Sequence, residues 1–393
     1  MSDNESMCTD ANALQSACPA DCKADPDGHR IAPGGSCPTG DALKPNAHTR
    51  RIMVGDVPVG GGAPVAVQSM LNQPANDVAA NLAQIERLAQ AGCEIVRMAV
   101  PDKGALTSFE QVCEASPLPV VADIHFSAQL AVEAAHRGAA KLRINPGNIG
   151  GLDATRPVLA AAHECGIPIR IGVNAGSLDR ELAAREDLSL PQKLVASAKA
   201  YARFCESEGF ADFAISAKAH DVPTTIATYR LLSRELPSVP LHIGVTEAGT
   251  LFQGLIKSAS GLGILLEEGI GDTLRISLTD DPVEEVRASW GLLAALGLRK
   301  RYPELVSCPT CGRCKVDLIS LAKQVEERLA HMPRPLSVAV MGCVVNGPGE
   351  AADADIGVAC GDGSGVVFAQ GKTLRKVPEE RIVEALMEEI GKL

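Results

Sequence analysis

The chain has 393 residues, of which 46% are hydrophobic and 22% are charged, and its formal net charge is −11. This balance is typical of a globular protein with two or three domains. The negative charge and an aromatic content of only 3% argue against a nucleic-acid partner, because polyanions bind basic surfaces and single-stranded bases stack on aromatic rings.

The sequence also argues against export and against a membrane anchor. The first ten residues, MSDNESMCTD, are acidic and polar, whereas a signal peptide needs a basic and then an apolar run. No apolar stretch is long enough to span a bilayer. The thirteen cysteines are odd in number in a large chain, so we expect free thiols, metal ligands and a reducing cytoplasm.

Residues 1–49 are rich in Asp, Asn, Ser, Pro and Gly, and we expect them to form a flexible tail. The tail contains Cys8, Cys18, Cys22 and Cys37. These thiols could bind zinc or a second cluster, or they could be incidental. Their irregular spacing and the lack of a histidine pattern lead us to predict no site in the tail.

Residues 50–300 alternate between short apolar runs and amphipathic helical stretches. Eight strand and helix units of this length predict a (βα)8 TIM barrel, with an open doubly wound sheet as the alternative. The expected helices include 78–91, 128–137, 191–208, 222–235 and 282–295. The expected strands are 65–69, 94–100, 119–125, 141–145, 168–174, 212–218, 241–246 and 273–277.

A second, smaller α+β domain is expected at residues 301–393, after the basic connector GLRKRYPEL. It contains a predicted helix at 316–330, an apolar strand at 336–342 and a closing helix at 379–390. Two further short strands are expected near Ile356 and Val366. About 90 residues are enough to fold around a cofactor.

Cationic side chains recur on the predicted barrel strands. Residues two apart on a strand share a face, so Arg143 projects with Asn145, and Arg170 with Asn174. Most of these polar residues lie near the carboxyl ends of the strands, where (βα)8 enzymes place their active sites. Five cations in an acidic protein favour a site for an anion such as a diphosphate. The five are Arg97, Arg143, Arg170, Lys218 and Arg275, and Ser216 and Ser277 share faces with the last two.

The alternative for these cations is a structural role, either facing outward or neutralised by Asp123, Glu247 or Asp272. His125 and His242 are candidates for general acids, metal ligands or core histidines. Glu247 follows the seventh strand and can transfer a proton at the barrel mouth, or it can cap a helix or pair with an arginine.

Four thiols mark the second domain. Cys308, Cys311 and Cys314 form a CxxCxxC run, and Cys343 precedes the segment NGPGE. Such soft ligands bind an iron-sulfur cluster or a structural zinc ion. Four thiolates would make a closed electron-transfer site, whereas three would leave one iron open to a substrate oxygen. Glu350 is then a candidate for a labile fourth ligand.

With these motifs assembled, the chain resembles the bacterial 4-hydroxy-3-methylbut-2-enyl diphosphate synthases of the non-mevalonate isoprenoid pathway. The resemblance extends from Arg51 to the C-terminus. Its motifs are GDVPVGGGAPVAVQSM, VADIHF, LRINPGNIG, IRIGVNAGSL, VTEAG, GIGDTLRISL, DPVEE, SCPTCGR and GCVVNGPGE.

The resemblance implies a barrel that binds 2-C-methyl-D-erythritol 2,4-cyclodiphosphate and a second domain that carries a [4Fe-4S] cluster. It places the cluster ligands at Cys308, Cys311, Cys343 and Glu350, with Cys314 outside the motif. It also implies a head-to-tail homodimer and flavodoxin or ferredoxin as the electron donor. The implied substrate-binding residues are Arg97, Arg143, Arg170, Asn174, Lys218, Arg275 and Ser277.

The expected reaction opens the cyclic diphosphate and removes a hydroxyl group, using two electrons delivered through a cluster with an exchangeable ligand at Glu350. We expect Glu247 to protonate the departing hydroxyl. Three rivals differ from this enzyme: a cluster-free barrel enzyme such as a pterin-type synthase, a zinc-stabilised binding protein, and an electron carrier with four protein ligands.

Overall fold

The computed structural model describes residues 23–24, 30–31, 48–330, 332–343, 351 and 353–393. The chain divides into two units, Met1–Ala42 and Leu43–Leu393. In the first, β1 (Lys23–Ala24) pairs with β2 (Arg30–Ile31) in an antiparallel fashion. The tail cysteines considered above lie outside the described residues. Within the described parts of the chain, no helix has the length and apolar character that a bilayer span requires.

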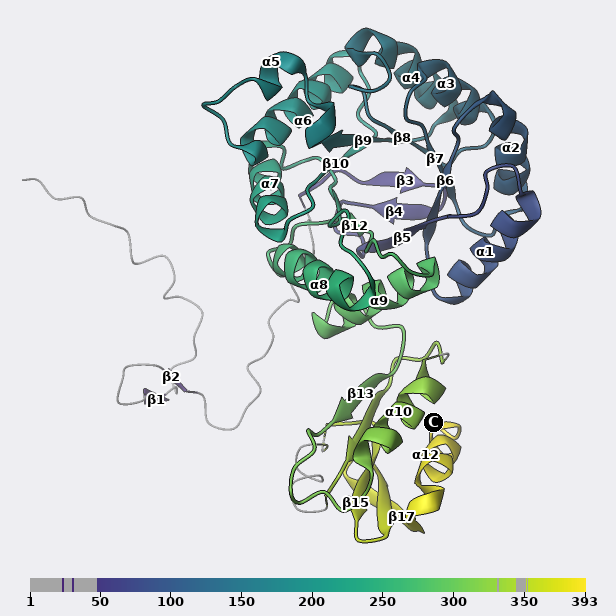
Figure 1. The fold of residues 1–393 in the computed structure, drawn as a ribbon, viewed down its shortest axis with the longest axis vertical. Coiled ribbons are helices and arrows are strands. Elements are labelled where there is room, and N and C mark those ends of the chain that lie inside the picture. Colours follow the sequence, from purple (N-terminus) through teal and green to yellow (C-terminus); the bar gives the residue numbers. More distant parts are fainter. Residues whose placement is uncertain (1–22, 25–29, 32–47, 331, 344–350, 352) are drawn as a thin grey trace, which may run out of the picture. The chain divides into compact units, whose positions relative to one another are not determined.

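Eight parallel strands form a barrel, in the hydrogen-bonded order β10-β9-β8-β7-β6-β5-β12-β11 (Figure 1). An isolated parallel bridge between Ile215 and Leu241 joins the two ends of this series. The TIM barrel is therefore confirmed, and the open doubly wound sheet is wrong. The strands are β5 (Ala66–Met70), β6 (Ile95–Ala99), β7 (Val120–Asp123), β8 (Lys141–Ile144), β9 (Ile169–Asn174), β10 (Phe213–Lys218), β11 (His242–Ile243) and β12 (Thr273–Leu274).

Helices surround the barrel and begin where the sequence places capping side chains. Asp77 accepts a hydrogen bond from the Ala80 amide at the first helix, and Asp221 accepts one from Thr224 at a later helix. The five expected helices are confirmed with small shifts at their ends. The helices are α1 (Val78–Gln90), α2 (Leu106–Ala115), α3 (Ala128–His136), α4 (Gly151–Cys165), α5 (Arg180–Ala183), α6 (Leu190–Ser207), α7 (Val222–Glu235), α8 (Leu251–Glu267) and α9 (Pro282–Ala295).

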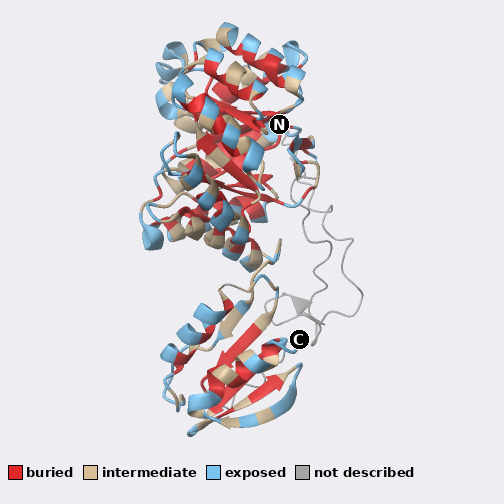
Figure 2. Ribbon diagram, turned by 90° about the vertical axis from the view of Figure 1, so that its right-hand side faces the viewer, coloured by how far each residue is buried: buried red, intermediate tan, exposed pale blue. Residues whose placement is uncertain are grey.

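A short hairpin closes the end of the barrel at which the strands begin. Its strands are β3 (Ile52–Val54) and β4 (Val57–Val59), and Figure 1 shows them inside the ring of strands. Their buried side chains pack with inward-facing residues from the starts of the barrel strands, such as Ala66 and Val121. The eight apolar runs from which the barrel was predicted did not include this hairpin. The centre of the barrel is buried, as Figure 2 shows in red.

The C-terminal domain contains one five-stranded sheet in the order β13-β14-β15-β16-β17. The first three strands are parallel, and the last two are antiparallel to their neighbours. One face packs against α10 (Leu318–Leu329) and α12 (Ile382–Ile390) and forms a separate core. The strands are β13 (Glu304–Ser307), β14 (Ser337–Met341), β15 (Ile356–Gly361), β16 (Ser364–Ala369) and β17 (Lys372–Pro378), of which the first and last were not predicted.

Candidate functional site

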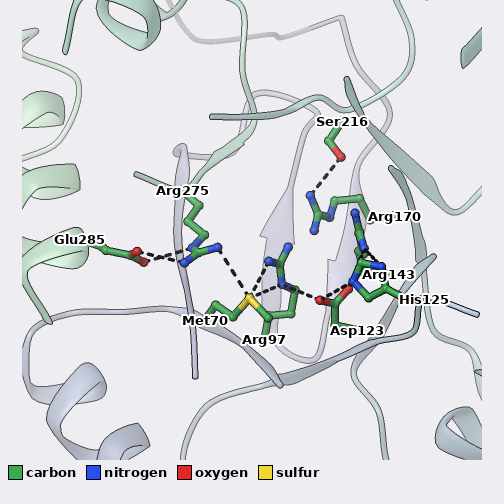
Figure 3. Close-up of polar contacts among 9 residues, drawn as sticks. All are labelled: Met70, Arg97, Asp123, His125, Arg143, Arg170, Ser216, Arg275 and Glu285. Atoms are coloured by element: carbon green, nitrogen blue, oxygen red, sulfur yellow. Dashed lines mark hydrogen bonds and ion pairs between the residues drawn. The ribbon is translucent and has the colours of Figure 1, made fainter. Parts of the chain in front are cut away.

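Four of the five predicted cations lie on β6, β8, β9 and β10, and Arg275 lies just beyond β12. Figure 3 shows the four arginines inside the barrel, and the Lys218 side chain lies next to Gly244 of the barrel. Arg143 and Arg170 lie in register on adjacent strands, and Lys218 is in register with Asn174. Arg170 is 1% exposed, while the side chains of Arg97 and Arg143 are 11% and 10% exposed. The alternative in which these cations face outward is therefore wrong. We refer to Arg97, Arg143, Arg170, Lys218 and Arg275 as the cationic cluster.

Asp123 on β7 joins two members of the cluster (Figure 3). Its carboxylate lies 3.1 Å from the Arg143 guanidinium and 3.5 Å from that of Arg97. Burial acts to raise its pKa, but Arg97, a hydrogen bond with His125 and Arg143 outweigh burial and hold the pKa well below its usual range. Asp123 is therefore a permanent anion in the cluster, and the neutralising role considered for it is partly confirmed.

His125 lies between the buried pair of Asp123 and Arg143 and the solvent. Its Nε2 atom lies 2.9 Å from the Arg143 guanidinium and 3.4 Å from the Asp123 carboxylate. The side chain is 43% exposed, so the ring is open to a molecule that approaches the cluster. His125 is therefore neither a core histidine nor isolated from the predicted site.

Glu285 on α9 holds Arg275 with two hydrogen bonds, a partner that the strand pattern did not reveal. The Arg275 Nε and Nη2 atoms donate to the two carboxylate oxygens at 3.1 and 3.0 Å. Glu285 also accepts hydrogen bonds from the Ser69 hydroxyl and the Leu278 amide. Its side chain is 2% exposed. The DPVEE motif was visible in the sequence, but only the helix packing directs its second glutamate into the barrel wall.

The Met70 thioether lies between Arg97 and Arg275 (Figure 3). The Arg97 Nε atom donates to the Met70 sulfur at 3.2 Å, and the Arg275 Nη1 atom lies 3.7 Å from the same sulfur. A thioether is a weak acceptor for a guanidinium. The centre of the cluster therefore contains strong donors that face a poor acceptor, an arrangement that an incoming anion would improve.

Arg170 shows the same shortage of acceptors more clearly. Its Nη1 atom donates to the Ser216 hydroxyl at 3.0 Å, while its Nε and Nη2 atoms have no partner among the described residues. Burial, followed by Arg97 and Arg143, lowers its pKa well below the usual value. Burial, followed by Arg170 and Arg275, does the same for Lys218. Asp123 and Glu285 do not balance five cations, so the cluster favours a multivalent anion.

Three other predicted residues lie around the ends of the strands. Asn174 ends β9 and is half-buried, and Ser277 lies two residues beyond Arg275 and is also half-buried. Glu247 follows β11, is exposed and has a left-handed backbone with φ of 53°. Asp272 instead accepts hydrogen bonds from Thr49 and the Leu241 amide at the beginning of the strands.

The inward faces carry a further polar layer that the sequence analysis mostly missed. Lys141 precedes Arg143 by two residues on β8, and Gln68 precedes Met70 by two residues on β5. Lys141 and His242 are fully buried, and Gln68 is 1% exposed. Strict alternation along KLRIN would have placed Lys141 on the face of Arg143. His242 is buried in the core, as one of its alternatives expected, but neither of its ring nitrogens has a hydrogen-bond partner among the described residues.

The thiols of the C-terminal domain emerge from two adjacent strands. Cys308 follows β13 and Cys343 follows β14, and these parallel strands pair Ser307 with Val340. The Gly342 amide donates to the Cys308 sulfur at 3.3 Å. A Cβ atom on Gly342 would lie 2.7 Å from the Cys314 sulfur, so Cys314 is next to the same turn.

The described residues contain no group of three or more His, Cys, Asp or Glu side chains close enough together to hold a metal ion. Glu350 lies outside the described residues. The donor chemistry nevertheless suits a cluster. The Gly342 amide donates a hydrogen bond to the Cys308 sulfur, and hydrogen bonds from the backbone and side chain of Arg313 lower the pKa of Cys311. Cys311 is exposed on its loop, as a ligand that receives an inorganic group must be.

Comparison with known proteins gives the family of the chain. Residues 49–290 match the model of the GcpE TIM-barrel domain, and residues 304–392 match that of the GcpE protein C-terminal domain. The chain belongs to the GcpE family. This assignment agrees with the barrel and the separate C-terminal sheet described above.

Two relatives of this GcpE family member are named 4-hydroxy-3-methylbut-2-en-1-yl diphosphate synthase (flavodoxin). The protein from Geobacter sulfurreducens is 54% identical over 347 residues, which cover 88% of this chain and 98% of the relative. The protein from Caldanaerobacter subterraneus subsp. tengcongensis is 51% identical over 351 residues, or 89% of this chain and 99% of the relative. The similarity therefore includes both domains.

Proposed function

We propose that this protein is a 4-hydroxy-3-methylbut-2-enyl diphosphate synthase. It converts 2-C-methyl-D-erythritol 2,4-cyclodiphosphate to the linear allylic diphosphate, with consumption of two electrons and release of water. The observation that supports this assignment most directly is the cationic cluster, a buried set of guanidinium donors with too few acceptors. Relatives that this chain matches over nearly their full length are named 4-hydroxy-3-methylbut-2-en-1-yl diphosphate synthase (flavodoxin).

The cluster would bind the diphosphate within residues 50–300. Among the described residues, no group pairs with the Nε and Nη2 donors of Arg170 or with the Nε donor of Arg143. Guanidinium groups match phosphate oxygens with paired hydrogen bonds, and a dry site strengthens each of them. Asn174 and Ser277 would add neutral donors at the ends of the strands. Asp123 and Glu285 keep their arginines oriented when the anion is absent.

Residues 301–393 would hold a [4Fe-4S] cluster through Cys308, Cys311, Cys343 and Glu350. When bound, this group supplies single electrons to the substrate. The Gly342 amide would hold the Cys308 sulfur in place. Cys314 donates to the Val316 carbonyl at 3.3 Å and is assigned no ligand role.

Glu247 is our candidate for the proton donor to the departing hydroxyl group. It is exposed beyond the end of β11, on the side of the barrel where the cationic cluster lies. Its left-handed backbone conformation is uncommon for a residue with a side chain. Such a conformation at a loop is consistent with a carboxyl group held in a required direction.

The proposed partners are a flavodoxin or ferredoxin as electron donor and a second copy of the chain. Flavodoxin appears in the names of the relatives. We propose a head-to-tail homodimer in which the C-terminal domain of one subunit covers the barrel of the other. We propose the reducing cytoplasm as the compartment, because the thiolate ligands of an iron-sulfur cluster must stay reduced.

The test begins with anaerobic purification, followed by iron, sulfide and zinc analysis and a turnover assay with the cyclic diphosphate. We expect a brown protein with four irons per chain, as the proposed cluster requires. A colourless zinc protein would contradict the enzyme assignment. A brown protein would be an electron carrier if it did not convert the cyclic diphosphate and if adding this compound left its electron paramagnetic resonance spectrum unchanged.

Two variants separate binding from proton transfer. Arg170→Gln should weaken binding of the cyclic diphosphate by at least about 30-fold, because it removes a buried cation from a multivalent anion site. Glu247→Gln should leave binding nearly unchanged and lower kcat. Arg156→Gln is the matched control, since that arginine is on the surface in an ion pair with Glu208. Unchanged turnover in Glu247→Gln would remove Glu247 from the mechanism.

A further inference from the structure

A buried lysine, Lys141, lies two residues before Arg143 of the cationic cluster on the same strand. The Lys141 side chain is fully buried on the inward face of β8, two residues before Arg143. Its Nζ atom has no hydrogen-bond partner among the described residues, and it forms none of the ion pairs found there. An ammonium group in such a place is costly, because nothing replaces its lost hydration. The structure therefore favours the neutral amine when no ligand is bound.

The neighbouring strands make the environment of Lys141 more positive. The only carboxylate on the inward faces of the described barrel strands is Asp123, which is already paired with Arg97 and Arg143. Glu285 reaches the barrel from α9 and is paired with Arg275. The charged and titratable groups on the inward faces are Arg97 on β6, Asp123 on β7, Arg143 on β8, Arg170 on β9, Lys218 on β10, His242 on β11 and Arg275 just beyond β12.

Two groups in this layer can change their charge, and they differ in how easily they do so. Burial, followed by Arg170 and Arg97, lowers the pKa of Lys141 to about 7. Burial, followed by Arg170, Lys218 and Lys141, lowers the pKa of His242 well below its usual value. Near neutral pH a modest change in local potential therefore changes the charge of Lys141, whereas His242 stays neutral.

We propose that Lys141 is a positioning residue that takes up one proton from solvent when a cyclic diphosphate binds to the cationic cluster. This inference rests on the proposed function for the identity of the anion. The Nζ lone pair accepts the proton, and the resulting ammonium adds a positive charge only when an anion is present to balance it. The ligand does not supply this proton, because each phosphorus of a cyclic diphosphate carries one acidic oxygen that is already ionised at neutral pH.

As a consequence, the net charge of the site becomes more positive when the diphosphate binds. Without ligand, a neutral Lys141 spares the barrel a further like charge next to Arg170 and Arg97. With ligand, the protonated side chain strengthens the field that holds the diphosphate. Substrate affinity and proton uptake are then thermodynamically linked.

Titration calorimetry of the cluster-loaded enzyme tests this link. The enzyme is kept anaerobic without a reductant, and the cyclic diphosphate is titrated in buffers of different ionisation enthalpy at pH 6 and pH 8. At pH 8 we expect uptake of roughly half to one proton per site, since free Lys141 is then mostly neutral. At pH 6 the uptake should fall close to zero, because Lys141 is already protonated before the ligand binds.

Lys141→Met and His242→Gln form the matched pair of variants. Lys141→Met should bind the ligand at pH 8 without proton uptake, whereas His242→Gln should retain the wild-type uptake. Uptake that persists in Lys141→Met would overturn the inference. If Lys141→Met does not fold, the proton uptake of the wild type at the two pH values tests the inference by itself. Equal uptake at pH 6 and pH 8 would then overturn the inference. If the wild type shows no binding heat in any buffer, the proposed function itself fails.

Discussion

At the scale of single residues, the site is defined by an imbalance between donors and acceptors. Arg97, Arg143 and Arg170 are all nearly buried, yet within the described part of the chain only the first two contact a carboxylate. Removing one partner of a buried ion pair lowers the free energy of unfolding by more than the pair itself contributes. The reason is that the remaining charge stays buried without a counter-charge. Asp123 is therefore the residue whose loss the barrel should tolerate least.

We expect Asp123→Asn to lower the free energy of unfolding by roughly 3–5 kcal/mol at pH 7, because two buried guanidinium groups lose their carboxylate. The folded-state pKa of Asp123 is depressed, so its contribution is complete above the unfolded pKa of about 4 and is lost as pH falls below that value. Denaturant unfolding at several pH values measures this difference. Asp153→Asn, at a side chain that is 99% exposed, is the control and should change stability little. A constant difference down to pH 2 would contradict the argument.

The sequence predicted the cationic residues because they follow strand alternation, which is a local property. Arg143 and Arg170 could be placed on one face without any knowledge of their neighbours. Glu285 could not, because it lies on a helix and meets Arg275 only after α9 packs against the barrel. Lys141 had the same local signal as Arg143, but its burial depends on the closure of the whole ring.

At the scale of elements, the predictable parts were those with a strong periodic pattern. All eight barrel strands appear as short apolar runs, and the helices have apolar faces and capping aspartates. The hairpin of β3 and β4 has strands of three residues, which is too short for a period to be recognised. Strands β13 and β17 are mostly exposed or half-buried, so they lack the apolar residues on which the prediction relied.

The hairpin provides a test at this scale. Ile52 is 2% exposed within the barrel end, whereas the adjacent Met53 is 46% exposed. We expect Ile52→Ala to lower the free energy of unfolding by roughly 2–5 kcal/mol, because it leaves a cavity at the base of the barrel. Met53→Ala should change it by no more than about 0.5 kcal/mol. Equal effects of the two substitutions, measured by denaturant unfolding, would show that the hairpin does not close the barrel.

At the scale of the whole molecule, the proposed chemistry needs two domains that carry different parts of the site. The cationic cluster belongs to the barrel, and the candidate cluster ligands belong to the C-terminal domain. In the proposed head-to-tail homodimer, each active site combines the barrel of one subunit with the C-terminal domain of the other. A variant that is defective in one domain can then be complemented by a variant that is defective in the other.

Mixing Arg143→Gln with Cys343→Ala tests the shared site. Each variant alone should be inactive, because every site lacks either an anion-binding arginine or a cluster ligand. After the subunits are exchanged at random, about half of the dimers contain one of each, and one of their two sites is intact, so roughly a quarter of wild-type activity should return. The control mixture, Cys343→Ala with Cys308→Ala, should stay inactive because both defects lie in the C-terminal domain. If sites were built within one chain, no mixed dimer would contain an intact site, and an inactive first mixture with proven subunit exchange would therefore exclude the shared arrangement.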